Sequence, residues 1–348
     1  MAPRFSRARA VSLAIALILP LQAVPALAQQ ATGSLFFLNS AYDKAAAGYI
    51  DQYGVFQQTY ESGYWAGYTP STGSAQVINT ANGFVVYDRA SGSARVVRIS
   101  HEGLLVKGGK YAFSQWDHIV GSGTFLFFYN ANGAAAVGHI TPSGTFVQTQ
   151  WWGAGAFGYW THVVATNNHL VFYNQDTGLT ATGYISYSGY WMYTTSAYTM
   201  GHCDRLTSLG RYVLCYNSVN GYMEVIDIDG SGYPTPTQVV LVGGEYTHVV
   251  RHGRGVVFYA SGFGGAQFGY VDSNGFYVAT QLTSILMNLY HFSATADSVT
   301  STGDALLFYN GQYGAALVGT VDGAGQFLKT GETDLTPWWS DVVATAAR

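Results

Sequence analysis

Residues 170–174, LVFYN, are one of seven versions of a short apolar phrase that ends in an aromatic or aliphatic residue followed by an Asn-like residue. The last apolar residue of the phrase is Tyr173 here, and its counterparts are Leu38, Tyr87, Tyr129, Tyr216, Tyr259 and Tyr309. Successive copies lie 42 to 50 residues apart. A period near 45 along a whole chain indicates an array of identical supersecondary units.

One repeat predicts four strands. After Trp160 the chain reads as short apolar or β-branched runs separated by Asn- and Gly-containing turns. The runs cover residues 161–165, 169–173, 180–185 and 190–195. Strands of five or six residues with such turns are typical of an antiparallel meander.

A glycine recurs at one position of the repeat. An Ile or Val follows each anchor by 11 or 12 residues, and four residues later come Gly54, Gly103, Gly144, Gly189, Gly232, Gly275 and Gly325. A glycine kept at one position in every copy predicts a hairpin turn that needs a positive φ.

The two ends of the repeat array complement each other. WWSDVVAT, residues 338–345, has the pattern of a first strand, and SLFFLN, residues 34–39, has the pattern of a second. Pairing them would complete one blade and cover two open sheet edges. A solenoid would instead need polar caps at its ends. We therefore predict an all-β fold over residues 33–348, a closed seven-bladed β-propeller of four-stranded antiparallel blades.

Residues 1–28 have the pattern of a secretory signal peptide. A basic segment with Arg4, Arg7 and Arg9 precedes an apolar run, and Ala26-Leu27-Ala28 supplies the small residues of a cleavage site. Residues 29–32 would form a short linker. We expect export by the Sec route to the periplasm or the outside of the cell, without membrane insertion.

Charge argues against nucleic-acid and anionic-membrane partners. Without residues 1–28 the chain has 12 basic and 19 acidic residues, a formal charge of −7. No basic stripe remains that could follow a phosphate backbone. Charged residues make up 10% of the chain and aromatic residues 16%, which suits an exported β-protein with many turns.

The two cysteines, Cys203 and Cys215, flank a predicted turn near Leu209. On opposite strands of a hairpin they would face each other, so we predict a disulfide in an oxidising compartment. Two buried free thiols are the alternative.

One position at the start of each first strand is often polar. This set should surround the mouth of the central channel and comprises Gln76, His118, His162, Asp204, His248, Ser298 and Asp341. Histidine and aspartate could bind a metal or an acidic ligand there. The favoured interpretation is structural, with each side chain bonded to the neighbouring blade, and metal binding stays open.

Aromatic residues concentrate in segments predicted to connect blades. The candidates for ligand binding are Tyr64, Trp65, Tyr68, Trp151, Trp152, Phe157, Tyr159, Trp191 and Tyr198. Rings beside Gly, Ser and Asn suit stacking on sugars, and they also suit anchoring at a protein interface. Alternatively they fold back over blade edges. Trp116, Trp160 and Trp339 recur at one position and are predicted core residues.

Familiar catalytic motifs are absent from the sequence. The chain has no sialidase-type Asp box, no Gly-Xaa-Ser-Xaa-Gly elbow, no His-Glu-Xaa-Xaa-His motif and no phosphate-cradling glycine loop. The sequence therefore favours a protein without catalysis and without a cofactor, and a carboxylate pair acting across the channel stays open.

The phrases GYWTHVVATNNHLVFYN, residues 158–174, and QWDHIVGSGTFLFFYN, residues 115–130, resemble the repeats of tachylectin-like β-propeller lectins. The resemblance covers the chain from about residue 33 onward and implies binding of N-acetylated sugars between blades. The founding lectin fold has five blades, whereas this chain has seven repeats, and no binding residue transfers.

Taken together, these patterns predict an exported, monomeric, lectin-like protein whose partner is a glycan or a cell-surface polysaccharide. One alternative is a polysaccharide hydrolase or lyase acting at the channel mouth. The other is a scaffold that binds an exported protein.

Overall fold

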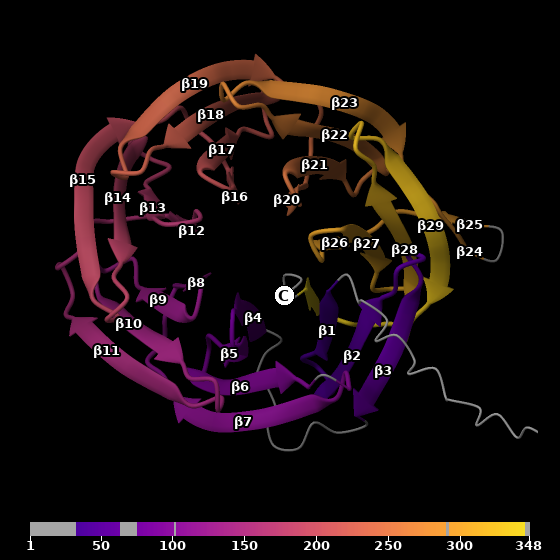
Figure 1. The fold of residues 1–348 in the computed structure, drawn as a ribbon, viewed down its shortest axis with the longest axis horizontal. Coiled ribbons are helices and arrows are strands. Elements are labelled where there is room, and N and C mark those ends of the chain that lie inside the picture. The colour runs from indigo at the N-terminus through magenta and orange to yellow at the C-terminus, as the bar shows by residue number, and fades with distance from the viewer. Residues whose placement is uncertain (1–32, 63–74, 101, 290–291, 345–348) are drawn as a thin grey trace, which may run out of the picture. The chain divides into compact units, whose positions relative to one another are not determined.

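The computed structural model describes residues 33–62, 75–100, 102–289 and 292–344. The predicted signal peptide, the linker and the candidates Tyr64, Trp65 and Tyr68 lie outside these residues. Within them the chain forms seven four-stranded antiparallel sheets arranged in a ring (Figure 1). The predicted seven-bladed β-propeller is confirmed.

Each blade has four strands, ordered from the channel outward. The innermost strands of blades 1 to 7 are β30 (Asp341–Ala344), β4 (Ala75–Thr80), β8 (His118–Ser122), β12 (His162–Ala165), β16 (Arg205–Leu209), β20 (His248–His252) and β26 (Ser298–Ser301). The second strands are β1 (Ser34–Asn39), β5 (Gly83–Asp88), β9 (Phe125–Tyr129), β13 (Leu170–Tyr173), β17 (Tyr212–Tyr216), β21 (Gly255–Ala260) and β27 (Ala305–Asn310).

The two outer layers continue the same order. The third strands are β2 (Lys44–Ile50), β6 (Ser93–Ile99), β10 (Ala135–Ile140), β14 (Leu179–Ile185), β18 (Tyr222–Ile228), β22 (Gly265–Val271) and β28 (Ala315–Val321). The outermost are β3 (Phe56–Ser62), β7 (Leu105–Ala112), β11 (Phe146–Trp152), β15 (Trp191–Thr199), β19 (Pro234–Leu241), β23 (Tyr277–Ser284) and β29 (Phe327–Asp334). A small ribbon of β24 (Met287–Leu289) and β25 (Phe292–Ala294) joins blades 6 and 7.

The ring closes as the two ends of the repeat array predict. Strand β30 pairs antiparallel with β1, with Leu35 opposite Ala344 and Leu38 opposite Asp341. Blade 1 therefore combines three strands from the start of the array with one from its end. This pairing leaves no unpaired sheet edge at the joint.

The core lies between neighbouring blades. The second strands are buried along almost their whole length, because successive side chains face the blades on either side. Phe36 of blade 1 stacks on Phe84 of blade 2 with ring centroids 5.3 Å apart. The outermost strands alternate instead, as in β23, because one of their faces meets solvent.

The tyrosine that ends the repeated phrase joins each blade to the next. In six blades its hydroxyl accepts a backbone N–H from the segment just before the next innermost strand, over 2.6 to 3.3 Å. In five of them the hydroxyl also donates to a nearby carbonyl. The tyrosines are Tyr87, Tyr129, Tyr173, Tyr216, Tyr259 and Tyr309. Buried hydrogen bonds of this kind contribute about 1 kcal/mol each.

The recurrent glycines make a second link at the opposite face of the ring. All seven have the predicted positive φ, between 74° and 84°. In five blade pairs a threonine hydroxyl of one outermost strand donates to the carbonyl of the next blade's glycine over 2.6 to 2.7 Å. Thr330 and Gly54 form this contact across the closure of the ring.

Cys203 and Cys215 form the predicted disulfide. Cys215 lies on β17, whereas Cys203 precedes β16 and was expected on that strand. Its backbone N–H bonds to the Tyr173 hydroxyl, so Cys203 occupies the position that Trp116 and Trp160 take elsewhere. A cross-link of this loop length contributes about 3 kcal/mol in the chain-entropy model. Across the described residues, no helix is long and apolar enough to cross a bilayer.

We expect Gly275→Ala to lower the free energy of unfolding by about 2–4 kcal/mol. Its φ is +83°, and an added Cβ would lie 2.7 Å from Thr237 Cγ2. Gly262→Ala in the same blade is the control, because its Cβ would meet no atom within 4 Å. Denaturant unfolding measures both, and equal stability of the two variants would contradict the account.

Candidate functional site

Seven residues occupy one position at the mouth of the channel. Each lies directly opposite the anchor residue of its own blade, as His118 lies opposite Tyr129. We call this set the mouth ring, and in order around the channel it comprises Asp341, Gln76, His118, His162, Arg205, His248 and Ser298. Neighbouring innermost strands contact one another all the way round.

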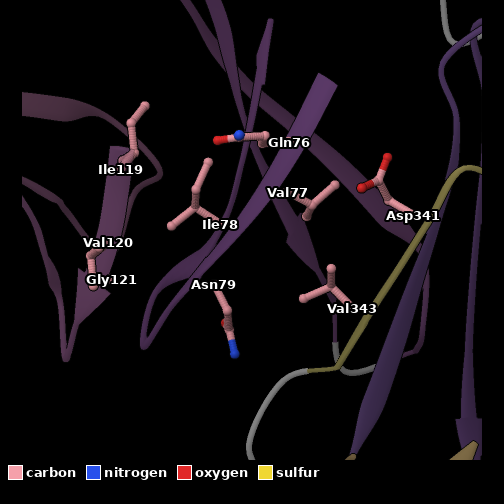
Figure 2. A pocket seen from close by; sticks show the side chains of 9 residues that line it. All are labelled: Gln76, Val77, Ile78, Asn79, Ile119, Val120, Gly121, Asp341 and Val343. Atoms are coloured by element: carbon pink, nitrogen blue, oxygen red, sulfur yellow. The ribbon is translucent and has the colours of Figure 1, made fainter. Parts of the chain in front are cut away.

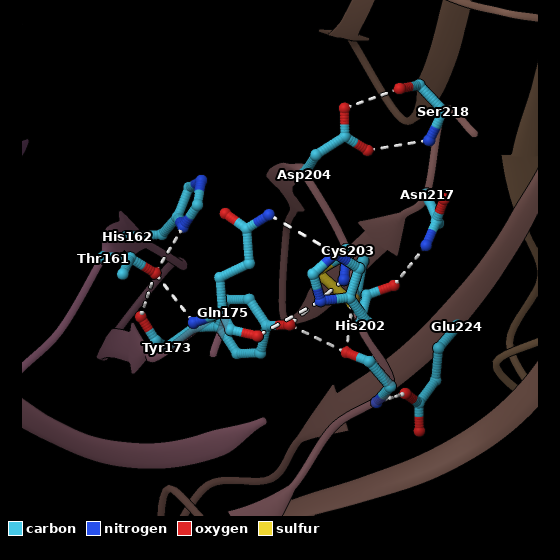
Figure 3. The surroundings of a disulfide bond; sticks show 12 residues. Thr161, His162, Tyr173, Gln175, His202, Cys203, Asp204, Asn217, Ser218 and Glu224 are labelled. Carbon is cyan, nitrogen blue, oxygen red and sulfur yellow. Dashed lines mark hydrogen bonds between the residues drawn. A yellow bond between two sulfur atoms is a disulfide. The ribbon is translucent and has the colours of Figure 1, made fainter. Parts of the chain in front are cut away.

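The placement of Asp204 in this ring was wrong by one residue, because Arg205 pairs with Tyr216. The Asp204 carboxylate points to the turn after β17, where it accepts from Ser218 N at 2.7 Å and Ser218 Oγ at 2.6 Å (Figure 3). The spacing in the sequence carried the signal. Ring residues of blades 2 to 7 precede their tyrosine by 11 residues, whereas Asp204 precedes Tyr216 by 12.

His248 is fully hydrogen-bonded within the protein. Its Nε2 lies 3.1 Å from the carbonyl oxygen of Asp297 in the next blade, so Nε2 carries the proton and donates. Its Nδ1 lies 2.8 Å from Thr247 Oγ1 and accepts from that hydroxyl. This histidine has the structural role that the sequence favoured for the ring.

His162 follows a threonine as His248 does, and the two threonine hydroxyls have matching backbone contacts, so the two histidines differ only at Nε2 (Figure 3). Thr161 Oγ1 accepts from Gln175 N at 2.8 Å and lies 3.1 Å from the Tyr173 carbonyl oxygen, to which it can donate. The hydroxyl also lies 2.9 Å from His162 Nδ1, which donates to it in the tautomer that carries the proton on Nδ1. That arrangement satisfies the hydroxyl and leaves Nε2 with an open lone pair, since no described residue bonds to it.

His118 lies on the neighbouring blade and stacks on Tyr129, with ring centroids 6.1 Å apart. Burial lowers the pKa of His118, His162 and His248 below the usual 6.5. The charge of Arg205 lowers the pKa of His162 and His248 further. All three imidazoles are therefore neutral at pH 7.

A pocket of about 490 Å³ lies between β30, β4 and β8, the innermost strands of blades 1 to 3 (Figure 2). Gln76 and Asp341 supply its polar groups at the mouth, and Asn79 lies deeper among Val77, Ile78, Ile119 and Val343. Burial raises the pKa of the Asp341 carboxyl, partly offset by its contact with Ser340 Oγ at 3.0 Å. Among the described residues, no group of three or more His, Cys, Asp or Glu could hold a metal ion.

Two candidate aromatic residues, Trp152 at the end of β11 and Phe157 in the loop that follows, pack into the core between blades 3 and 4. Trp152 lies edge-on to Phe157 with ring centroids 5.1 Å apart, and Phe157 contacts Phe127 at 5.7 Å. These two residues therefore follow the alternative interpretation, in which aromatic residues fold back over blade edges. Trp151 and Tyr159 stay 62% and 72% exposed.

Trp191 and Tyr198 lie on strand β15 and not in a loop. The Trp191 indole covers Gly183, where an added Cβ would lie 2.2 Å from the ring. An aromatic residue eight positions after a glycine repeats this contact in four other blades, at Phe56, Phe146, Tyr277 and Phe327. The Tyr198 hydroxyl donates to Glu224 Oε1 over 2.7 Å.

The asparagine after the anchor is a turn residue. Asn174 Oδ1 accepts the N–H groups of Asp176 and Thr177, each over 3.0 Å. Its Nδ2 also donates to the Tyr159 carbonyl and thereby fixes the segment that precedes β12, the innermost strand of the same blade.

No protein-family model and no curated protein matches the chain. Solved structures match it over almost the whole ring. A Bacteroides fragilis protein described provisionally as a 6-phosphogluconolactonase has a TM-score of 0.66 at 11% identity, over 92% of this chain and 99% of its own. The periplasmic gluconolactonase PpgL of Pseudomonas aeruginosa has a TM-score of 0.63 at 13% identity, over 91% and 99%.

A third similar structure is AztD from Citrobacter koseri, with a TM-score of 0.57 at 11% identity over 90% of this chain and 97% of its own. Identities this low establish the fold alone. The expectation of a non-catalytic lectin-like protein is nevertheless corrected by these comparisons, because structures that share the ring are named as lactonases. The resemblance to tachylectin-like repeats stays a prediction.

A buried histidine at the far end of β20 predicts acid sensitivity. His252 is 7% exposed and lies 3.2 Å from Ser301 Oγ, and burial lowers its pKa to about 4. The unfolded chain binds this proton near pH 6.5 but the folded chain only near pH 4. Stability present above pH 6.5 is therefore lost as the pH falls towards 4, by about 3 kcal/mol from this group.

Denaturant unfolding of the protein and of His252→Gln between pH 4 and 7.5 tests this. The variant lacks the titrating group, so its stability should decline less on acidification. Parallel pH profiles of the two proteins would show that His252 titrates normally and would contradict the assignment.

Proposed function

We propose that the protein is an exported hydrolase that opens a sugar lactone at the mouth ring, with His162 as the general base. The observation that carries the proposal is the Thr161–His162 pair. With the proton on Nδ1, which donates to Thr161, His162 has an open lone pair on Nε2, to which no described residue bonds. A base oriented through one nitrogen and open at the other is suited to activating water.

The protonation state of His162 fits this role. A general base must be unprotonated at working pH, and burial lowers the pKa of His162, so the neutral form predominates at pH 7. His118 is neutral by the same cause and lies on the adjacent blade. The charges of Asp204 and Asp117 raise the pKa of His162 and His118 respectively, but burial has the larger effect and the net shift is downward.

The reaction proceeds by addition and elimination. His162 Nε2 takes a proton from water as the oxygen attacks the lactone carbonyl carbon. The tetrahedral intermediate then breaks the ring C–O bond, and the imidazolium returns the proton to the leaving alkoxide. The product is an open-chain hydroxy acid, which ionises to a carboxylate and releases one proton to solvent.

Similar proteins support the substrate class. Two of the structures with the same ring are named for lactones of gluconic acid or its 6-phosphate. Export is supported by the disulfide, which persists in oxidising compartments, and by the periplasmic location in the name of one of these proteins.

Hydrolysis of glucono-1,5-lactone, followed by acid release, tests the proposal. We expect His162→Gln to lower kcat by about 10²–10⁴-fold, since that is the usual contribution of a positioned base. Thr161→Val keeps the base and removes its anchor, so kcat should fall less. The wild-type rate should be constant from pH 7 to 8 and fall on acidification through a pKa below 6.5.

His139→Gln is the matched control, because His139 lies opposite Phe125 at the far end of blade 3 from the mouth. It should retain the wild-type rate. Hydrolysis no faster than the spontaneous reaction, or equal rates for His162→Gln and wild type, would overturn the proposal.

A further inference from the structure

Arg205 is a cation of the mouth ring without a carboxylate partner. Its side chain is exposed, and its Nη1 makes a long contact of 3.4 Å with the carbonyl oxygen of Asp204. Within the described residues no ion pair includes it. By contrast Arg89, also at the mouth, pairs with Asp117, and Arg211, at the opposite face, lies 3.0 Å from Asp227.

The aspartate beside Arg205 is already occupied. Asp204 and Asp117 have the same position in their blades, one residue before the ring. Asp117 accepts from Ala131 N and also pairs with Arg89. Both oxygens of Asp204 instead bond to Ser218, so the Arg205 charge is left for the channel mouth.

Apart from Asp204, whose pKa the Arg205 charge helps to lower, the ring neighbours of Arg205 are the neutral side chains of His162 and His248. It lies on β16 between β12, which carries His162, and β20, which carries His248. The Arg205 charge lowers the pKa of histidines on both sides, which places the charge between these blades. The nearest carboxylate of blade 7, Asp297, is bonded to Gly311 N, and Asp341 lies across the ring.

We propose that Arg205, together with His162, binds a small oxyanion, the carboxylate or phosphate group of a sugar acid. A guanidinium presents paired N–H groups that match the oxygens of either anion. His162 can add a hydrogen bond at its open nitrogen once it takes up a proton. The site does not require hydrolysis, although the carboxylate released by the proposed reaction would be one occupant.

The proposal also explains why an acidic protein keeps an exposed, unpaired arginine in its channel. The whole chain has a formal charge of −4. A cation inside such a molecule concentrates anions locally. The pocket beside Gln76 and Asp341, on the other side of the mouth, then has room for the uncharged polyol part of the ligand.

Isothermal titration calorimetry at low ionic strength tests the site with three probes, which are inorganic phosphate, gluconate and glucose. We expect saturable binding of at least one anion at one site per chain and none of glucose. Binding of phosphate alone assigns the site to a phosphate group, and binding of gluconate alone assigns it to a carboxylate. Either result supports the proposal, and no anion binding overturns it.

Two arginine variants locate the site. Arg205→Gln should weaken anion binding by about tenfold or more, the value of a lost charge-assisted hydrogen bond. Arg211→Gln is the matched control, since it removes the same charge from the same blade at the opposite face. Equal weakening in both variants would mean a general charge effect and would overturn the assignment.

The anion-binding result can be distinguished from the result of the hydrolysis experiment. Anion binding without lactone hydrolysis would remove the hydrolase proposal and keep this site. Hydrolysis without saturable anion binding would keep the hydrolase proposal and remove the anion site. Thermal unfolding with and without phosphate checks folding of Arg205→Gln, whose Tm without phosphate should equal that of wild type.

Discussion

A tyrosine hydroxyl holds each of six blades to the next. It ends a buried second strand, accepts a backbone N–H from the neighbouring blade and, in most blades, donates to a carbonyl there. Because the phenol is long and rigid, it sets the distance between blades at the channel-mouth face. The threonine–glycine contact does the same at the opposite face. Where both kinds of hydrogen bond occur, neighbouring blades are joined at both faces of the ring.

The candidate site follows from this constraint. The residue opposite each of the six tyrosines, and the one opposite Leu38 in blade 1, must lie at the mouth, so seven side chains meet there from seven blades. The side chains of the mouth ring differ in the hydrogen bonds that they make to neighbouring residues. His248 is bonded at both nitrogens, His162 at one, and Arg205 has no carboxylate partner among the described residues. The repeat places one residue of each blade at the mouth, and the differences between these residues determine the chemical properties of the site.

The fold was predictable from the sequence because its determinants are local and repeated. The tyrosine phrase, the turn glycine and the complementary ends each recur or match within the chain. The site was less predictable. Asp204 was predicted in the ring, but it precedes Tyr216 by 12 residues, whereas the ring residue Arg205 precedes it by 11, as in the other blades with a tyrosine. Trp191 resembled a ligand-binding ring, yet it covers Gly183, a contact encoded by an eight-residue spacing. Which histidine nitrogen stays open depends on contacts between strands that no spacing reveals.

The proposed hydrolysis depends on the protonation state of His162, and ¹H–¹⁵N NMR of histidine-labelled protein measures that state directly. Long-range correlations from pH 5 to 8, assigned with His162→Gln, report which ring nitrogen carries the proton. The account predicts a neutral His162 at pH 7 with its proton on Nδ1 and a pKa below 6.5, beside a neutral His248 with its proton on Nε2. A His162 proton on Nε2, or a pKa above 6.5, would contradict it.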